Sequence, residues 1–245
     1  MLRLMASKVR LYLKHPLHET QAIPLSRDQA HYLFGVMRLG VGDVLTVFNG
    51  EDGAWQAEVA VASKRGGVLT CLMQMSPLRL PPDLWLLFAP IKKARTDFIV
   101  EKATEMGVRR ICPIQTEFTN AERIRQDRLQ AHAIEAAEQC GGTFVPEVTQ
   151  LQRLNDLLHR WPSERGLMFC DEAAADAGTG THLTDAKSGP WAVVIGPEGG
   201  FSEHERVKLL NMDQSVRIRL GPRILRADTA AVAALTVWQM ALGDW

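Results

Sequence analysis

The sequence is poor in cysteine and contains no long apolar run. Its four cysteines are scattered over 245 residues without a close pair: Cys71, Cys112, Cys140 and Cys170. Because zinc ligands usually come in pairs at short spacing, we expect no metal site, and unpaired thiols fit a reducing cytoplasm. No apolar segment approaches the roughly 18–20 residues of a membrane-spanning helix. Met1–Lys8 lacks the apolar core of a signal peptide, so we expect a cytoplasmic protein that contacts no membrane.

The sequence also lacks an excess of charge of either sign. It has 28 Lys and Arg against 28 Asp and Glu, a formal net charge of zero. Binding to nucleic acid would therefore have to come from local basic patches. Two such patches border Pro/Gly-containing loops: Lys92, Lys93 and Arg95, and the acid-free segment with Arg217, Arg219, Arg223 and Arg226.

Motifs of three large enzyme classes are missing as well. The chain has no G-x-G-x-x-G after a strand, no G-x-x-x-x-G-K-[ST] and no G-x-S-x-G. These absences remove the main support for a dinucleotide-binding enzyme, a P-loop nucleotide hydrolase and an α/β-hydrolase.

Residues 1–75 are predicted to form a small β-barrel domain. Short alternating segments at 9–13, 44–48, 55–61 and 68–73 are separated by Gly-rich turns, as in small barrels. Ser26 is expected to cap a helix that runs to Arg38. Three prolines within residues 76–82 then predict a stiff linker.

Residues 83–245 are predicted to form an α/β domain with a mostly parallel sheet covered on both faces. Apolar runs of strand length occupy 84–88, 110–114, 166–170, 191–195 and 216–220. Helical segments are expected near 96–106, 127–140, 151–160, 202–211 and 229–242. Near-continuous apolar strands that alternate with helices are typical of such sheets.

Two Gly-Pro loops follow predicted strands, at the edge of the sheet where α/β proteins bind ligands. They are Gly196-Pro197-Glu198-Gly199-Gly200 and Gly221-Pro222-Arg223-Ile224-Leu225-Arg226, and each leads into a helix that Ser202, or Asp228 or Thr229, would cap. Glycine lets a backbone approach a ligand, and proline stiffens the loop. One such loop alone would indicate only a turn, but two that contain Glu198 and Arg226 favour a binding site.

These loops carry a specific resemblance. Ile195–Ser202, IGPEGGFS, and Leu220–Ala230, LGPRILRADTA, resemble the cofactor loops of the RsmE family of SPOUT-class methyltransferases. The similarity extends to Pro90-x-Lys92, to the segments 101–108 and 134–141, and, in the first domain, to Arg10-Leu11-Tyr12 and the segment from His31 to Leu39. It covers nearly the whole chain.

The resemblance implies a fold, a cofactor, a substrate and an assembly. The fold would be a PUA-like RNA-binding domain followed by a SPOUT domain whose C-terminal end forms a trefoil knot. The cofactor would be S-adenosylmethionine, and the substrate would be N3 of a uridine in the 16S ribosomal RNA of the small subunit. The protein would be a homodimer. The family commonly has an Arg near residues 117–120, where none stands here, and either Arg123 or Arg125 could supply that phosphate contact.

Site residues are expected in three groups. RNA would be bound by Arg10, Arg38, Lys92, Arg95 and Arg223. Catalysis would use Arg226 or, failing that, Arg10 to stabilise the uracil anion, and Glu198 or Asp228 as a base, although Glu198 could equally hold its loop in shape. The cofactor would be bound by Ile195, Gly196, Pro197, Glu198, Gly199, Gly200, Leu220, Gly221, Pro222, Ile224, Leu225, Thr229 and Ala230.

Three alternatives stay open. The first is a SPOUT enzyme with another RNA target, such as a ribose hydroxyl in transfer RNA, which the PUA-like first half disfavours. The second is an RNA-binding ribosome-assembly factor without turnover, which the change to Ala227-Asp228 from the family's Thr-Glu would fit. The third, a nicotinamide-dependent dehydrogenase, lacks its motif.

Overall fold

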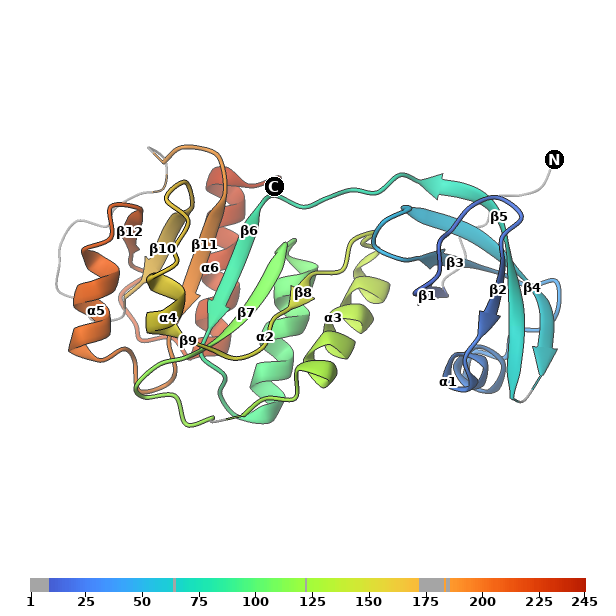
Figure 1. Cartoon of the computed structure of the whole chain (residues 1–245), viewed down its shortest axis with the longest axis horizontal. Helices are drawn as coiled ribbons and strands as arrows, with labels where there is room; N and C mark the ends of the chain where they lie inside the picture. The colour runs from blue at the N-terminus through green and yellow to red at the C-terminus, as the bar shows by residue number, and fades with distance from the viewer. Residues whose placement is uncertain (1–8, 64, 122, 172–182, 184–185) are drawn as a thin grey trace. The chain divides into compact units, whose positions relative to one another are not determined.

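The computed structural model of the chain describes residues 9–63, 65–121, 123–171, 183 and 186–245 (Figure 1). The chain divides into two compact units. The first contains the described residues up to Leu80 together with Ala137–Val145, and the second contains Pro81–Ala136 and the described residues from Pro146 to Trp245. The linker bounds of 76–82 stay a prediction.

The first unit is built on a five-stranded sheet, which confirms the predicted small β module. Its strands run in the order β1-β3-β4-β5-β2; β1 is parallel to β3, and the other neighbours are antiparallel. The inward-facing side chains form one apolar core that includes Leu11, Leu45 and Leu69. The strands are β1 (Arg10–Tyr12), β2 (Ala22–Leu25), β3 (Val44–Phe48), β4 (Ala54–Ser63) and β5 (Gly66–Ser76).

The helix between these strands begins as predicted and ends differently. Ser26 caps α1 (Arg27–Ala30) through a reciprocal pair of hydrogen bonds with Gln29. The chain then continues as a π-helix, η1 (His31–Val36), instead of one α-helix. The helical segment closes at Arg38, whose φ of 59° is left-handed.

The segment Ala137–Val145 packs within the first unit, which the sequence did not predict. The Glu138 carboxylate accepts a hydrogen bond of 2.7 Å from the Tyr12 amide, and Thr143 Oγ1 accepts one of 2.9 Å from the Arg79 amide. Ala137 is buried beside Phe48. The end of helix α3 therefore belongs to the core of the first unit.

The second unit is built on a parallel sheet, as predicted. The strand order is β12-β10-β11-β6-β7-β8, and β9 pairs with the end of β7. All of these neighbours are parallel, so their carboxyl ends meet at one edge. The strands are β6 (Leu84–Phe88), β7 (Arg110–Gln115), β8 (Glu147–Val148), β9 (Gln152–Arg153), β10 (Gly166–Cys170), β11 (Trp191–Ile195) and β12 (Ser215–Ile218).

Helices cover both faces of this sheet. Helices α4 (Leu154–Leu158) and α5 (Glu203–Leu210) contribute Leu154 and Leu209 to one apolar core. Helix α2 (Lys93–Glu105) packs against α6 (Ala227–Leu242), which contacts β11, on the opposite face (Figure 1). Helix α3 (Gln126–Cys140) runs from this unit into the first. Among the helices of the described chain, none has the length and apolarity to cross a membrane.

Two predicted helix boundaries were wrong. The helix expected at 151–160 is only Leu154–Leu158, because Gln152 and Arg153 form the short strand β9 on β7. Helix α6 begins at Ala227 after Arg226 in extended conformation, so neither Asp228 nor Thr229 caps it. The predicted cap of α5 is confirmed, since Ser202 and Glu205 form a capping box. The trefoil knot stays a prediction.

At the amino edge of the sheet, Arg165 ties three strands together. Its guanidinium binds the Asp83 carboxylate, with a shortest distance of 3.0 Å, and donates to the carbonyls of Asp83 and Trp191 at 3.1 and 3.0 Å. It also lies over the Trp85 ring, 3.7 Å from the centroid. The Arg165 side chain is only 7% exposed, so its buried positive charge needs the Asp83 carboxylate as a counter-charge.

We predict that Asp83→Ala lowers the free energy of unfolding by about 3 kcal/mol, because it leaves a buried guanidinium without a counter-charge. Glu105→Ala is the control. It breaks an ion pair with Lys102 that is about a third exposed on both sides, and it should change stability by less than about 1 kcal/mol. Urea denaturation followed by tryptophan fluorescence measures both. Equal losses in the two variants would show that Arg165 does not anchor the sheet through Asp83.

Candidate functional site

A cavity of about 380 Å³ lies at the carboxyl edge of the parallel sheet, where β10, β11 and β12 end. Its walls are the loop after β11, the loop after β12 and the first turn of α6. The volume is in the range of small-molecule binding sites. The position agrees with the rule that parallel sheets bind ligands beyond their carboxyl ends.

The structure brings the two Gly-Pro loops together around this cavity. The predicted cofactor residues all line it, with the exception of Gly199 and Thr229. Gly199 packs against Phe118, since a Cβ at Gly199 would lie 3.2 Å from that side chain. The Thr229 amide donates to the Asp228 carboxylate at 2.9 Å. The residues that do line the cavity are Ile195, Gly196, Pro197, Glu198, Gly200, Leu220, Gly221, Pro222, Ile224, Leu225 and Ala230.

The shape of both loops depends on glycine. Gly221 has a φ of 99°, a conformation that side-chain-bearing residues rarely adopt. Arg219 braces this turn by donating from Nε to the Gly221 carbonyl at 3.0 Å. At Gly196, a Cβ would lie 2.8 Å from the ring of Phe201, so any other residue would have to displace that ring.

The cavity wall offers apolar, acidic and basic groups. Ile195, Ile218 and Phe201 supply apolar surface, and Phe201 is held edge-on against Phe169 at a centroid distance of 5.4 Å. Glu198 and Glu203 supply carboxylates, of which Glu203 is paired with Arg206 at 3.0 Å, and further guanidiniums come from Arg219, Arg223 and Arg226. Such a wall can bind a molecule that combines a flat apolar group with polar or cationic parts.

Several wall residues were missed by the sequence reasoning, above all Asp171. Its carboxylate, 2% exposed, binds Arg206 of α5 at 3.0 Å and Arg217 of β12 at 2.7 Å. The pairing raises the pKa of Arg206. Asp171 directly follows a predicted strand, so the rule of looking just beyond strand ends would have found it. The other missed residues are Cys170, Phe201, Glu203, Arg206, Ile218, Arg219 and Ala227.

Two of the predicted catalytic residues, Arg226 and Glu198, line the cavity. Both are exposed, and within the described chain neither side chain has a hydrogen-bond or ion-pair partner. The Asp228 carboxylate is engaged elsewhere, 3.7 Å from Arg95. Arg226 is therefore free to contact a ligand instead of bracing its own loop through Asp228.

Arg10 lies in the first unit and is held there. Its guanidinium donates to the Gly142 carbonyl at 2.6 Å and lies 4.9 Å from the centroid of the Phe48 ring. Burial lowers the pKa of Arg10. These contacts give Arg10 a packing role within its own unit, and its predicted catalytic and RNA-binding roles stay predictions.

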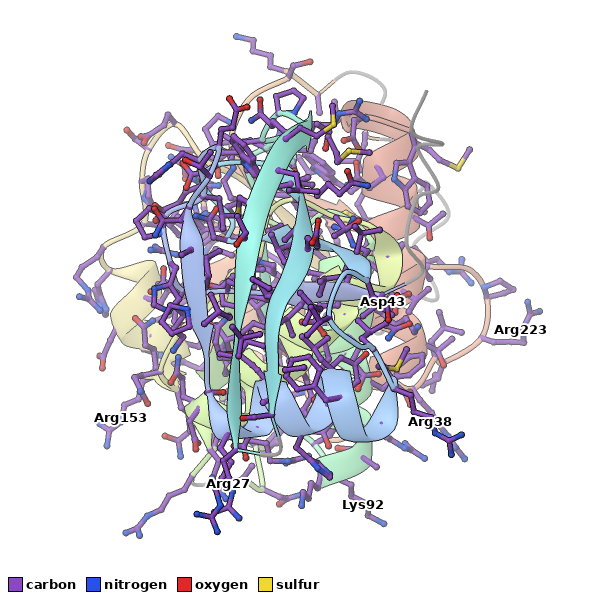
Figure 2. All side chains as sticks on the ribbon, turned by 90° about the vertical axis from the view of Figure 1, so that its right-hand side faces the viewer. Arg27, Arg38, Asp43, Lys92, Arg153 and Arg223 are labelled. Atoms are coloured by element: carbon purple, nitrogen blue, oxygen red, sulfur yellow. The ribbon has the colours of Figure 1, made fainter. Side chains whose placement is uncertain are left out.

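The other predicted RNA contacts have different surroundings. Arg38, Lys92 and Arg223 are exposed, and their side chains extend away from the ribbon (Figure 2). Arg223 also belongs to the cavity wall. Arg95 is paired with Asp228, so less of its charge is available.

Two thiols of the second unit have raised pKa values. Cys170 is part of its wall, and Cys112 is buried in β7. Burial raises the pKa of each thiol to about 12. Both are therefore protonated at neutral pH and are not nucleophiles there.

Comparison with known protein families gives two matches. Residues 78–239 match the model of an RNA methyltransferase domain, and residues 25–70 match that of an RNA methyltransferase PUA domain. The first match alone covers more than half of the chain.

Individual proteins are similar over nearly the full length. A Rickettsia conorii protein named ribosomal RNA small subunit methyltransferase E is 28% identical over 92% of this chain and 93% of its own. The crystal structure of a Neisseria gonorrhoeae protein of the same name, bound to S-adenosyl methionine, is 28% identical with a TM-score of 0.87, and it covers 97% of this chain and 99% of its own. The structure of a Legionella pneumophila putative methyltransferase in complex with the bound cofactor SAM is 28% identical with a TM-score of 0.87. It covers 98% of this chain and 100% of its own.

The raised thiol pKa values predict a loss of stability in alkali. In the unfolded chain Cys112 and Cys170 ionise near their ordinary value of 9.0, whereas in the folded chain they keep their protons up to about 12. Between these values the unfolded state binds fewer protons, so the free energy of unfolding falls as pH rises. The slope for two thiols is up to about 2.7 kcal/mol per pH unit.

Denaturation from pH 8 to pH 10.5 tests this expectation by comparing the wild type with Cys112→Ala/Cys170→Ala. The variant removes the two thiols and should therefore decline less steeply, although Lys and Tyr titration affects both proteins. Cys140→Ala is the control, because Cys140 is exposed. Parallel declines of all three proteins would contradict the assignment.

Proposed function

The chain belongs to the RNA methyltransferase family, and from that premise we propose that it transfers a methyl group from S-adenosylmethionine to N3 of a uridine in small-subunit ribosomal RNA. The observation that carries the proposal is the cavity formed by the two Gly-Pro loops. Support comes from full-length relatives named for methylation of small-subunit ribosomal RNA, and from similar structures with bound S-adenosylmethionine.

The cavity fits the proposed cofactor. Ile195, Ile218 and Phe201 would surround an adenine ring, the main chain of the glycine loops would bind its polar edge, and Glu198 would attract the cationic parts. When bound, S-adenosylmethionine supplies an electrophilic methyl group on a positively charged sulfur. The remaining catalytic tasks fall to the protein.

Those tasks are to orient the uracil, to remove the proton on N3 and to stabilise the resulting negative charge. Among the charged groups of the cavity wall, Arg223, Arg226 and Glu198 are exposed and have no partner within the described chain. We assign Arg226 to the uracil oxygens, where negative charge develops, in the manner of an oxyanion hole. We assign Glu198 to the N3 proton as general base. Orientation in the cavity supplies a large part of the rate.

The first unit is proposed to bind the RNA. Its segment 25–70 matches a PUA domain of RNA methyltransferases, and Arg38 at the end of η1 presents an exposed guanidinium. The target base has to leave any stack or pair before it reaches a cavity of this size, which costs a few kcal/mol. The homodimer and the cytoplasmic location that the resemblance implies stay predictions.

Binding of S-adenosylmethionine is predicted to depend on Gly221. Gly221→Val should weaken the affinity at least tenfold, because a branched side chain distorts a turn of the cavity wall whose φ is positive. Isothermal titration calorimetry with S-adenosylmethionine measures the dissociation constant. The matched control is Gly42→Val: Gly42 has a φ of 89° and equally open space around its Cβ position, but it lies in the first unit. Unchanged affinity in a folded Gly221→Val protein would reject the cofactor site.

Turnover is predicted to depend on Arg226. Arg226→Ala should lower kcat for methyl transfer to small-subunit ribosomal RNA by a factor on the order of 10²–10³, as the loss of one oxyanion-type donor does. Affinity for S-adenosylmethionine should change little, since the contact forms mainly in the transition state. Arg226→Lys should restore only part of the rate, because an ammonium cannot reproduce the planar guanidinium.

Arg219→Ala provides the contrast within the same loop. Arg219 braces the Gly221 carbonyl, so its loss should weaken cofactor binding and leave kcat at saturating cofactor near normal. If Arg226→Ala shows that second pattern, Arg226 is a loop brace, and the assignment to catalysis is wrong.

A further inference from the structure

A second cleft, of about 600 Å³, lies at the same carboxyl edge of the parallel sheet, at the end of β7. It is lined by three arginines, Arg123, Arg153 and Arg160, together with Asp156 and glutamines such as Gln115. Arg123 comes from the loop that follows β7, Arg153 from β9, and Arg160 from the turn after α4. We propose that this basic cleft binds the phosphate backbone of the substrate RNA beside the cofactor cavity, an inference that rests on the proposed function.

The charge of the cleft is available to a ligand. Three arginines against one aspartate give a formal charge of +2, from three minus one. Within the part of the chain that the structure describes, none of the three guanidiniums lies in an ion pair; Arg160 only donates from Nε to the Asp156 carbonyl, at 3.2 Å. Other arginines of this unit, such as Arg128 and Arg206, are paired with carboxylates. Arg153 extends outward from the ribbon (Figure 2).

The structure also resolves which of two nearby arginines faces the cleft. Arg123 lines it, whereas Arg125 is bound to Asp127 at 2.7 Å and lies outside the lining. The hydrogen bond to Asp127 raises the pKa of Arg125. Of the two candidates for a phosphate contact, Arg123 is therefore the one whose charge is free.

The lining chemistry favours backbone recognition over base reading. Among the described residues, no aromatic side chain lines the cleft, so it offers no platform for base stacking. Guanidiniums bind phosphate oxygens, and the amides of Gln115, Gln150 and Gln152 can bind ribose hydroxyls. The cleft would therefore hold the strand without reading its sequence.

The position of the cleft fits a strand that also reaches the cofactor cavity. In the sheet, β7 is two strands from β11, which corresponds to about 10 Å. The loop after β7 connects the two sites: the Glu117 amide donates to the Glu205 carboxylate at 2.9 Å, and Phe118 packs on Gly199 of the cofactor loop. A nucleotide at the cavity would thus have its neighbours near the cleft.

The salt dependence of RNA binding tests the proposal. Association constants of the full chain for in vitro transcribed small-subunit ribosomal RNA are measured by fluorescence anisotropy at several KCl concentrations. The slope of log K against log[KCl] is negative, and each lost phosphate contact makes it less steep by about 0.7. Arg123→Gln should therefore weaken binding about fivefold at 0.1 M KCl, and Arg153→Gln/Arg160→Gln about 25-fold with a slope change of about 1.4, if affinities converge at 1 M.

Arg125→Gln is the matched control, two residues from Arg123 on the same loop, and it should change affinity less than twofold. In methyl-transfer assays the cleft variants should raise KM for RNA and leave kcat and the affinity for S-adenosylmethionine unchanged. Equal effects of Arg123→Gln and Arg125→Gln, or an unchanged slope in the double variant, would overturn the proposal. Weaker binding to assembled subunits with normal binding to free RNA would point to a ribosomal protein as the occupant and would also overturn it.

Two further readouts keep the result unambiguous. If the double variant does not fold, ultraviolet cross-linking of the wild type to RNA that contains 4-thiouridine replaces it. Cross-links should fall in peptides 115–125 and 149–160, and cross-links confined to other peptides would reject the cleft.

The methylation activity of the wild type separates the two proposals. Absence of that activity rejects the proposed function, whereas an active wild type with normal RNA affinity in the cleft variants rejects only the cleft.

Discussion

The Asp171 carboxylate, buried just after β10, holds together the two Gly-Pro loops that line the cavity. One of its partners, Arg206, follows the first Gly-Pro loop on α5, and the other, Arg217, precedes the second on β12. A carboxylate with 2% exposure is very unfavourable without a counter-charge, whereas both arginines stay partly hydrated. The ends of the two loops therefore cannot separate without a large loss of free energy. The cavity between them depends on this one buried group.

A second buried carboxylate extends the same framework toward β7. Glu205 accepts hydrogen bonds from the Ser202 amide, at 3.0 Å, and from the Glu117 amide, at 2.9 Å. The first contact fixes the start of α5, and the second fixes the loop after β7. The main chain before α5 and the loop after β7 are therefore both held by hydrogen bonds to the buried Glu205 carboxylate. The consequence is that Arg223 and Arg226 at the cavity, and the arginines of the basic cleft, do not have to hold these loops, and their charge stays available.

Much of the fold could be predicted from the sequence because buried parallel strands are nearly continuous apolar runs. The strands at 84–88, 166–170 and 191–195 have the predicted bounds. Strand β2 was missed because Pro24 interrupts its pattern, which is tolerated there since β2 is an edge strand. The helix α4 was predicted too long because the pairing of Gln152–Arg153 with β7 is a tertiary contact without a local signal. The inclusion of Ala137–Val145 in the first unit has the same cause.

The candidate site could be predicted less completely than the fold, because the partners of its charged residues are set by tertiary contacts. Gly-Pro motifs mark two loops, but they do not show that a third strand end brings Asp171 between them. The basic cluster at 217–226 looks uniform in the sequence, yet its arginines differ. Arg217 forms an ion pair with Asp171, and Arg219 donates a hydrogen bond to the Gly221 carbonyl. Arg223 and Arg226 are left at the cavity, where a substrate can meet them. The protein has no net charge. Its ability to bind an anionic ligand therefore depends on which arginines have no carboxylate or carbonyl partner, and only the folded structure shows that.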